Sequence, residues 1–140
     1  MKVLIDTNVL FSAALFRHSV PYYAFAKAVS APYYGVVCDK NIEELKRIFN
    51  RKASDKIETL NRFLATALFI LEIVPTPEIA ITEESKIRDV EDRPILRAAL
   101  NAQVDVLLTG DKDFLESGIT SLRILSPTEF LAYDGQSDAS

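Results

Sequence analysis

Two aspartates follow directly after a short apolar segment near the end of the chain. Val104–Thr109 is a short, mostly apolar run typical of a parallel strand covered on both faces, and Gly110 ends it. Asp111 and Asp113 come immediately afterwards. Because open α/β sheets bind their ligands beyond the carboxyl ends of the strands, we expect this acidic pair to hold a cationic group.

Further carboxylates lie beside other predicted strand ends or helix starts. They are Asp6, the neighbours Glu43 and Glu44, and Asp89 or Asp92. Taken singly, aspartates such as Asp6, Asp92 and Asp111 can be explained as helix caps. Taken together they are harder to explain, because two carboxylates ~4 Å apart repel by about 4 kcal/mol at an effective dielectric constant near ~20. A fold rarely carries that cost unless a cation or a shared proton relieves it.

Helical spacing distinguishes the two adjacent glutamates. The apolar face of the expected helix Lys40–Lys52 is made by Ile42, Leu45, Ile48 and Phe49. At about 100° per residue, the centre of this face lies roughly 110° from Glu44 and roughly 150° from Glu43. Glu44 is therefore expected to flank the buried face and Glu43 to point into water. The alternative is that both are solvated and that Glu44 pairs with a lysine.

The residue types favour a hard cation over other chemistries. Ligation by carboxylate oxygens alone selects Mg²⁺ or Mn²⁺ over Zn²⁺. The one histidine, His18, falls in an expected loop, and Cys38 has no neighbouring thiol cluster, so we assign neither to the site. No serine stands in a nucleophile-elbow context, and the four glycines are not grouped into a phosphate-binding loop.

Length and charge restrict the possibilities further. We expect one domain over residues 1–133 and a flexible C-terminal tail over 134–140 of the 140 residues. The net charge of −4 argues against broad adhesion to nucleic acid but does not exclude a nucleic-acid substrate. A single cysteine, no signal-like start and no apolar run of about 18 residues lead us to expect a cytoplasmic protein.

Apolar periodicity predicts alternating strands and helices. The expected strands are Lys2–Ile5, Tyr33–Val37, Glu72–Val74, Val104–Thr109 and Leu122–Leu125. The expected helices are Val9–Phe16, Tyr22–Val29, Lys40–Lys52 with Asp39 as its cap, Lys56–Leu71 and Pro94–Ala102, with a closing turn over Thr128–Tyr133. Glu83–Glu91 is expected to be irregular or briefly helical. This alternation predicts an α/β fold with helices on both faces of a parallel sheet, although the pattern leaves the strand order open.

Four sequence motifs in order resemble one known family. They are Val-Leu-Ile-Asp-Thr-Asn-Val-Leu at the start, Ile-Glu-Glu-Leu in the middle, Asp-Val-Glu-Asp-Arg-Pro-Ile-Leu-Arg-Ala-Ala, and Leu-Leu-Thr-Gly-Asp-Lys-Asp-Phe-Leu. The chain resembles the PIN-domain ribonucleases over nearly its whole length, most of all the toxins of VapBC-like toxin–antitoxin pairs. The resemblance implies a three-layer α/β/α fold with a five-stranded parallel sheet of order 3-2-1-4-5. The first and fourth strands are then neighbours, which brings Asp6 and Asp111 together.

The resemblance also implies a catalytic and metal-binding quartet. Its members are Asp6, Glu44, Asp92 and Asp111, with Asp113 as an auxiliary carboxylate and Thr7, Asn8 and Thr109 as supporting hydrogen-bonding groups. Glu43 competes with Glu44, and Asp89 with Asp92; Asp92 is preferred because it directly precedes the Arg-Pro helix start. The implied cofactor is Mg²⁺ or Mn²⁺, and the implied partners are a small antitoxin that blocks the acidic groove and a second copy of the chain.

The function expected from these residues is metal-dependent hydrolysis of RNA phosphodiester bonds. Phosphate contacts are expected from Lys46, Arg47, Arg93 and Arg97, although a solvated helix face explains the first two equally well. One alternative is a non-catalytic PIN-like module that binds RNA or protein without cutting, which the full set of acids argues against. Phosphoryl transfer of the receiver or haloacid-dehalogenase-like kind ranks lower, because residue 8 is asparagine and no lysine follows the late strand in the required context.

Overall fold

A five-stranded parallel sheet forms the centre of the computed structural model, which describes residues 1–135. The strands are β1 (Lys2–Ile5), β2 (Tyr34–Cys38), β3 (Glu72–Val74), β4 (Val106–Leu108) and β5 (Arg123–Leu125). Their order is β3-β2-β1-β4-β5, and each pairing is parallel. The fold class and strand order expected from the resemblance are thereby confirmed. The predicted tail, residues 134–140, lies outside the described residues except for its first two positions.

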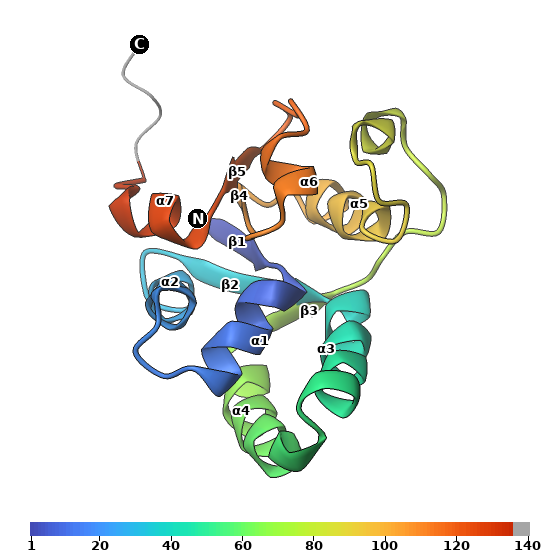
Figure 1. The fold of residues 1–140 in the computed structure, drawn as a ribbon. Coiled ribbons are helices and arrows are strands. Elements are labelled where there is room, and N and C mark those ends of the chain that lie inside the picture. Colours follow the sequence, from blue (N-terminus) through green and yellow to red (C-terminus); the bar gives the residue numbers. More distant parts are fainter. Residues whose placement is uncertain (136–140) are drawn as a thin grey trace.

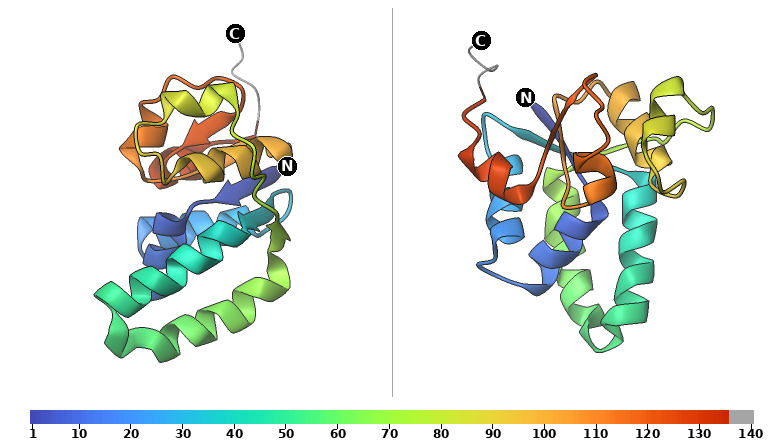
Figure 2. Two further views of the ribbon diagram at one scale, coloured as in Figure 1. Left: turned by 90° about the vertical axis from the view of Figure 1, so that its right-hand side faces the viewer. Right: turned by 45° about the horizontal axis from the view of Figure 1, so that its top comes forward.

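Helices connect the strands and cover both faces of the sheet. They are α1 (Thr7–Leu15), α2 (Val20–Ala28), α3 (Asp39–Lys52), α4 (Ile57–Ile70), α5 (Arg93–Asn101), α6 (Lys112–Leu115) and α7 (Pro127–Ala132), with short 3₁₀ turns η1 (Ser54–Lys56) and η2 (Thr82–Lys86). In Figure 1, α1 to α4 lie below the sheet and α5 and α6 above it, and Figure 2 shows the same layers from two other sides. Among the described residues, no helix has the length and apolar character needed to cross a membrane.

Two apolar cores, one on each face, explain why the strands read as apolar runs. Val3 and Ile5 of β1 pack with α1 to α4, whereas Leu4 between them packs with α5 and α6. Successive side chains of a strand point to opposite faces, so a strand covered on both sides must be apolar at every position. Val3, Leu4 and Ile5 are accordingly fully buried.

The topology places two strand ends next to one another. In the register of β1 and β4, Ile5 lies opposite Leu108, and the Asp6 backbone N–H donates to the Leu108 carbonyl at 2.9 Å. The chain leaves β1 toward α1 and leaves β4 toward α6. Ligands of doubly wound sheets bind where neighbouring strands diverge in this way.

The element boundaries differ from the sequence predictions in several places. Helix α1 begins at Thr7 rather than Val9, because Asp6 already caps it by accepting from the Thr7 N–H at 2.8 Å. The prediction that Asp39 caps α3 is wrong: the helix begins at Asp39, and the side chain of Asn41 accepts from the preceding Cys38 N–H at 3.0 Å. Helix α6 had no apolar repeat by which to predict it, since it spans a single turn.

Candidate active site

Asp6 is a buried carboxylate at the end of β1. Its Oδ1 accepts from the Thr7 backbone N–H at 2.8 Å and its Oδ2 accepts from the Thr109 hydroxyl at 2.8 Å. Burial raises the pKa of Asp6 from 3.8 to about 6 despite these two hydrogen bonds, and the negative charges of Glu44 and Asp111 raise it further. An ionised Asp6 at neutral pH therefore carries an electrostatic cost that a nearby cation would relieve.

Asp111 is held at the end of β4 by its own local turn. Its Oδ1 accepts from the Asp113 N–H at 2.9 Å, which caps α6, and its own N–H donates to the Thr109 hydroxyl oxygen at 3.0 Å. The Asn8 side chain accepts from the Gly110 N–H at 3.1 Å. Thr109 thus joins the ends of β1 and β4, because the same hydroxyl contacts Asp6 and the backbone of Asp111.

Asp92 approaches from the opposite layer, at the residue before α5. Its carboxyl hydrogen-bonds with Asp111. Burial raises the pKa of Asp92 from 3.8 to about 8, helped by the bond to Asp111 and by the charges of Asp111, Asp6 and Asp89. Without a cation, burial and the neighbouring Asp111 therefore favour the protonated form of Asp92. A proton shared between two carboxylates is one of the two ways in which a fold relieves their repulsion.

Glu44, and not Glu43, faces this group. Glu43 is exposed and pairs with Lys40 at 3.9 Å, one turn earlier on α3. Glu44 is half-buried, and its carboxylate accepts a hydrogen bond from the Thr7 side chain. Burial raises the pKa of Glu44, Arg47 and Thr7 oppose this rise, and the charges of Glu91 and Asp89 add to it. The expectation from helical spacing, that Glu44 flanks the buried face of α3 and Glu43 points into water, therefore agrees with the structure.

Asp89 and Asp113 extend the cluster toward solvent. One carboxylate oxygen from each of Asp89, Asp92 and Asp113 lies within 4.8 Å of the other two. Asp113 is held by Arg88, whose Nη2 lies 2.7 Å from its Oδ1. These three form the tightest ligand set among the described residues, and it shares only Asp92 with the expected quartet. Asp92 thus links an inner group, made of the buried Asp6 and the half-buried Glu44 and Asp111, to an outer group containing Asp89 and Asp113.

The donor atoms of this cluster fit a hard divalent cation. They are carboxylate oxygens, the ligands that Mg²⁺ and Mn²⁺ prefer. His18 lies elsewhere, with its Nδ1 2.9 Å from the Tyr23 hydroxyl, and Cys38 is buried beside Asn41. No nitrogen or sulfur ligand therefore enters the described cluster to favour Zn²⁺.

The expected phosphate-binding residues have different surroundings. Arg97 donates to Glu84 at 2.6 Å and to the carbonyl oxygens of Pro77 and Glu78 at 3.0 and 3.3 Å, so its guanidinium holds the loop before α5. Arg93 donates through Nε to the Ile87 carbonyl at 2.9 Å. These contacts engage both side chains within the protein, and their assignment to RNA binding stays a prediction.

Lys46 and Arg47 remain exposed on α3. At about 100° per residue, Arg47 and Arg51 lie roughly 60° and roughly 20° from Glu44, whereas Lys46 lies roughly 160° away. The charge of Arg47 lowers the pKa of Glu44, which places the two side chains near one another. Arg47 is therefore the better placed of the two expected residues to meet a phosphate beside the acids.

Sequence reasoning missed three polar residues that the fold uses near this site. Arg88 holds Asp113, Glu84 holds Arg97, and Asn41 bridges Cys38 and Thr7. The partners of Arg88 and Glu84 lie 25 and 13 residues away, so no local spacing indicates these pairs. Asn41 gives a local signal, because it stands three residues after the end of a strand, where a side chain can cap the helix that follows.

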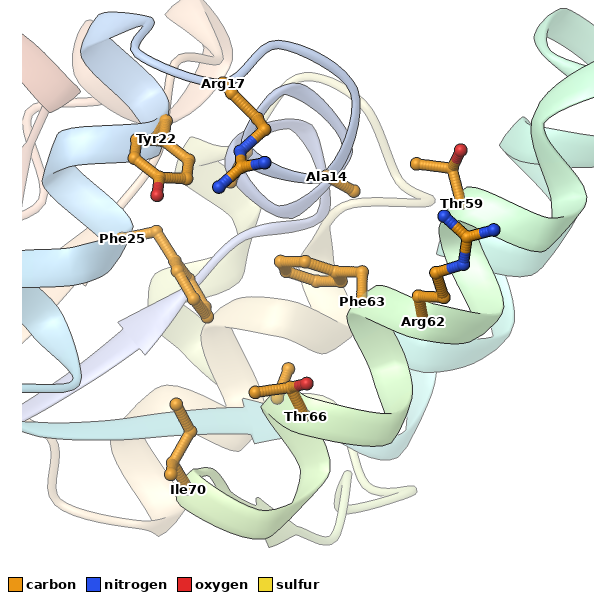
Figure 3. Close-up of a pocket in the computed structure, with 11 residues that line it drawn as sticks. Ala14, Arg17, Tyr22, Phe25, Thr59, Arg62, Phe63, Thr66 and Ile70 are labelled. Carbon is orange, nitrogen blue, oxygen red and sulfur yellow. The ribbon is translucent and has the colours of Figure 1, made fainter.

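A groove of the described structure lies away from the acids. It has a volume of about 590 Å³ between α1, α2 and α4, and none of its lining residues is acidic. Figure 3 shows Phe25 and Phe63 pointing toward one another in its lining, with Arg17 and Tyr22 close together above them. The rings of Phe25 and Phe63 lie 5.3 Å apart, centre to centre. With no carboxylate, histidine or cysteine in its lining, this groove offers no side-chain ligand for a metal ion.

Comparison with known proteins identifies the family. The family model described as "PIN domain" matches residues 2–113, which include each member of the expected quartet. The chain belongs to the PIN domain family. PIN domains are typically metal-dependent nucleases. No curated protein sequence matches the chain closely enough to be informative.

Solved structures support the same fold for this PIN domain. VapBC2 of Rickettsia felis, bound to a DNA fragment from its promoter, has a chain that is 16% identical with a TM-score of 0.66, covering 90% of this chain and 98% of that one. VapC20 of Mycobacterium tuberculosis, a toxin that cleaves the Sarcin-Ricin loop, is 12% identical with a TM-score of 0.60, covering 86% and 98%. FitAcB of Neisseria gonorrhoeae is 18% identical with a TM-score of 0.64, and the match covers 90% of this chain and 98% of that one. At these identities the likeness shows the fold alone.

A matched pair of variants tests the choice between the glutamates. Glu44→Gln is expected to weaken Mn²⁺ binding by about 10-fold or more, because it removes a charged oxygen from the cluster, while Glu43→Gln is expected to leave binding unchanged. Isothermal titration of each variant with Mn²⁺ measures the difference. Equal losses in both variants would contradict the assignment of Glu44.

Proposed function

We propose that this PIN domain is a divalent-metal-dependent endoribonuclease. The observation that carries the proposal is the convergence of Asp6, Asp111 and Asp92, from two strand ends and the start of α5, on one partly buried cluster. The raised pKa values of Asp6 and Asp92, about 6 and about 8, mark this cluster as electrostatically strained without a cation. Carboxylates with strongly raised pKa values that gather in one place mark a candidate catalytic site.

The chain's own residues would divide the work at this site. Asp6, Glu44, Asp92 and Asp111 would hold the cation, with Asp113 and Asp89 beside them. Thr7 and Thr109 fix the Asp6 carboxylate through the bonds described above. Asp92 would lose the proton that it shares with Asp111. A bound divalent cation supplies the positive charge that activates a water and neutralises the phosphate.

A nuclease assay on defined RNAs, with and without EDTA, tests this function directly. We expect wild-type protein to cut single-stranded RNA in Mg²⁺ or Mn²⁺ and to stop when EDTA is added. A DNA oligonucleotide of the same sequence separates ribonuclease from general nuclease activity. RNA that is bound but left intact in either metal would support the alternative, a non-catalytic PIN-like module.

RNA binding is expected to depend on Arg47 more than on Lys46. Arg47→Gln should weaken binding of an RNA oligonucleotide several-fold and reduce the slope of log affinity against log salt by about 0.7, because one phosphate contact is lost. Lys46→Gln, which removes the same charge on the far side of α3, is the matched control and should change neither quantity. Fluorescence anisotropy in EDTA measures both. Equal effects of the two variants would show that the helix contributes only diffuse charge.

We further propose that the protein acts as the toxin of a toxin–antitoxin pair, with the antitoxin seated partly in the groove between α1, α2 and α4. Apolar side chains of a partner helix would fill the space beside Phe63 and Ala67, and its acidic residues would meet Arg17 and Arg62 at the rim. Arg17 has no ion pair within residues 1–135, whereas Arg62 pairs with Glu58 on its own helix. VapBC2 and FitAcB support this proposal as related folds.

Co-expression with the product of a small reading frame next to the gene tests the partner. We expect the two proteins to co-purify and the complex to show no RNA cleavage. Thr66→Trp places a large side chain in the groove and is expected to break the complex. Thr128→Trp, on the exposed face of α7, is the control. Absence of any such complex would contradict the toxin assignment while leaving the ribonuclease assignment intact. Light scattering on the purified chain tests the expected homodimer.

A further inference from the structure

Asn41 is a fully buried amide that the functions above do not use. It lies in the first turn of α3, three residues before Glu44. Its Oδ1 accepts from the Cys38 backbone N–H at 3.0 Å and from the Cys38 thiol at 3.2 Å. Its Nδ2 donates to the Thr7 hydroxyl oxygen at 3.0 Å. A buried side chain with partners at both ends of its amide has one orientation only.

The direction of these bonds follows from what each group can do. A backbone N–H can only donate, so the amide oxygen of Asn41 faces Cys38 and the amide nitrogen must face Thr7. The Thr7 hydroxyl has a single hydrogen, and because it accepts from Asn41 that hydrogen is directed to its other partner. That partner is the carboxylate of Glu44. Asn41 therefore converts a freely rotating hydroxyl into a fixed donor.

Thr7 in turn contacts two members of the quartet. Its backbone N–H donates to Asp6 Oδ1 at 2.8 Å, and its hydroxyl donates to Glu44. Thr7 is 1% exposed, so no bulk water competes for these bonds. One residue at the start of α1 thus sets the relative placement of an acid from β1 and an acid from α3.

We propose that Asn41 is a positioning residue of the acidic site: through the Thr7 hydroxyl it holds the Glu44 carboxylate in the orientation that binds a divalent cation. This inference rests on the proposed metal-dependent function. Hydrogen-bonding partners behind metal ligands contribute about 10- to 100-fold to metal affinity. Asn41 acts on the cation through another side chain, so its effect must disappear when that side chain is removed.

A double-mutant cycle with Mn²⁺ as the probe tests this dependence. Free Mn²⁺ is measured by electron paramagnetic resonance at pH 7.5 in titrations of wild type, Asn41→Leu, Thr7→Val and the double variant. We expect each single variant to weaken Mn²⁺ binding about 10-fold, and the double variant to be no weaker than the weaker single one. Thr7→Ser, which keeps the hydroxyl, should restore affinity close to wild type. Asn50→Leu, at an exposed position of α3, is the matched control with unchanged affinity.

Each outcome decides for or against the inference. Wild-type affinity in folded Asn41→Leu, or losses that multiply to about 100-fold in the double variant, would overturn it while the proposed function stands. Circular dichroism checks folding; if Asn41→Leu does not fold, Asn41→Ala replaces it, since alanine adds no bulk. If Asn41 had a purely structural role, Asn41→Leu would lower the melting temperature of both wild type and Thr7→Val without changing their affinity for Mn²⁺. If wild type itself binds no Mn²⁺, the proposed function falls together with the inference.

Discussion

Replacing Asp6 by asparagine is expected to reduce RNA cleavage about 1,000-fold and to leave the fold intact. The substitution removes the buried negative charge on which the cation site depends. Charge stabilisation by a metal ion amounts to several kcal/mol in the transition state, and about 4 kcal/mol corresponds to about 1,000-fold in rate. Single-turnover cleavage of a labelled RNA in saturating Mn²⁺ measures this loss.

The same variant is expected to be more stable than wild type when no metal is present. Asparagine keeps an oxygen to accept from the Thr7 N–H, so the cap of α1 is retained. It also removes the cost of ionising a carboxyl whose pKa is about 6. We expect metal-free Asp6→Asn to exceed wild type by about 1 kcal/mol or more at pH 8 in urea unfolding, the ionisation cost removed being larger than the hydrogen bond lost. Loss of cleavage together with loss of structure would count against a catalytic role for Asp6.

The stability of the metal-free wild type is expected to fall as pH rises from about 4 to 8. A carboxyl with a raised pKa in the folded state binds its proton more tightly than in the unfolded chain. Its contribution is therefore fully present below the unfolded value and is lost as pH rises through the folded value. For the buried Asp6 the change from 3.8 to about 6 corresponds to about 3 kcal/mol. The raised pKa of Asp92, about 8, extends this loss of stability toward pH 8.

Added Mg²⁺ or Mn²⁺ is expected to reverse this loss. A cation at about 100 times its dissociation constant stabilises the folded state by about 2.7 kcal/mol. The effect should be larger at pH 8 than at pH 5, because protons compete for the same carboxylates. Thermal melts at several pH values, with EDTA or with metal, measure the difference. If the metal-free protein in EDTA became more stable as pH rises, then groups of the protein itself, and not a cation, would be stabilising the ionised carboxylates.

The junction of β1 and β4 was predictable from the sequence because both strands are short apolar runs that end in an aspartate. Parallel strands present their carboxyl ends at the same edge of a sheet. The one thing that the strand patterns did not predict is that β1 and β4 are neighbours. That adjacency came from the resemblance, since apolar patterns do not encode strand order. Glu44 was predictable in a different way, because the phase of a 14-residue helix fixes which of two neighbouring residues turns inward.

Interactions that depend on irregular segments were not predictable. Arg97 was expected to bind RNA because it lies near Asp92 in the sequence, and its ion pair with Glu84 of η2 at 2.6 Å was not predicted. Residues 75–92 contain only a short 3₁₀ turn, so no periodicity predicts how this loop folds back on α5. Asp89 and Asp92 were treated as competitors, whereas the fold places both in the cluster.

The most direct test of the central claim is a Mn²⁺ titration of the wild-type chain at pH 7.5, monitored by electron paramagnetic resonance, alongside Asp6→Asn. The account predicts saturable binding by the wild type that is displaced by Mg²⁺ and strongly weakened in the variant. Wild-type protein that leaves all Mn²⁺ free, or a variant that binds it as tightly as wild type, would contradict a cation site built on Asp6.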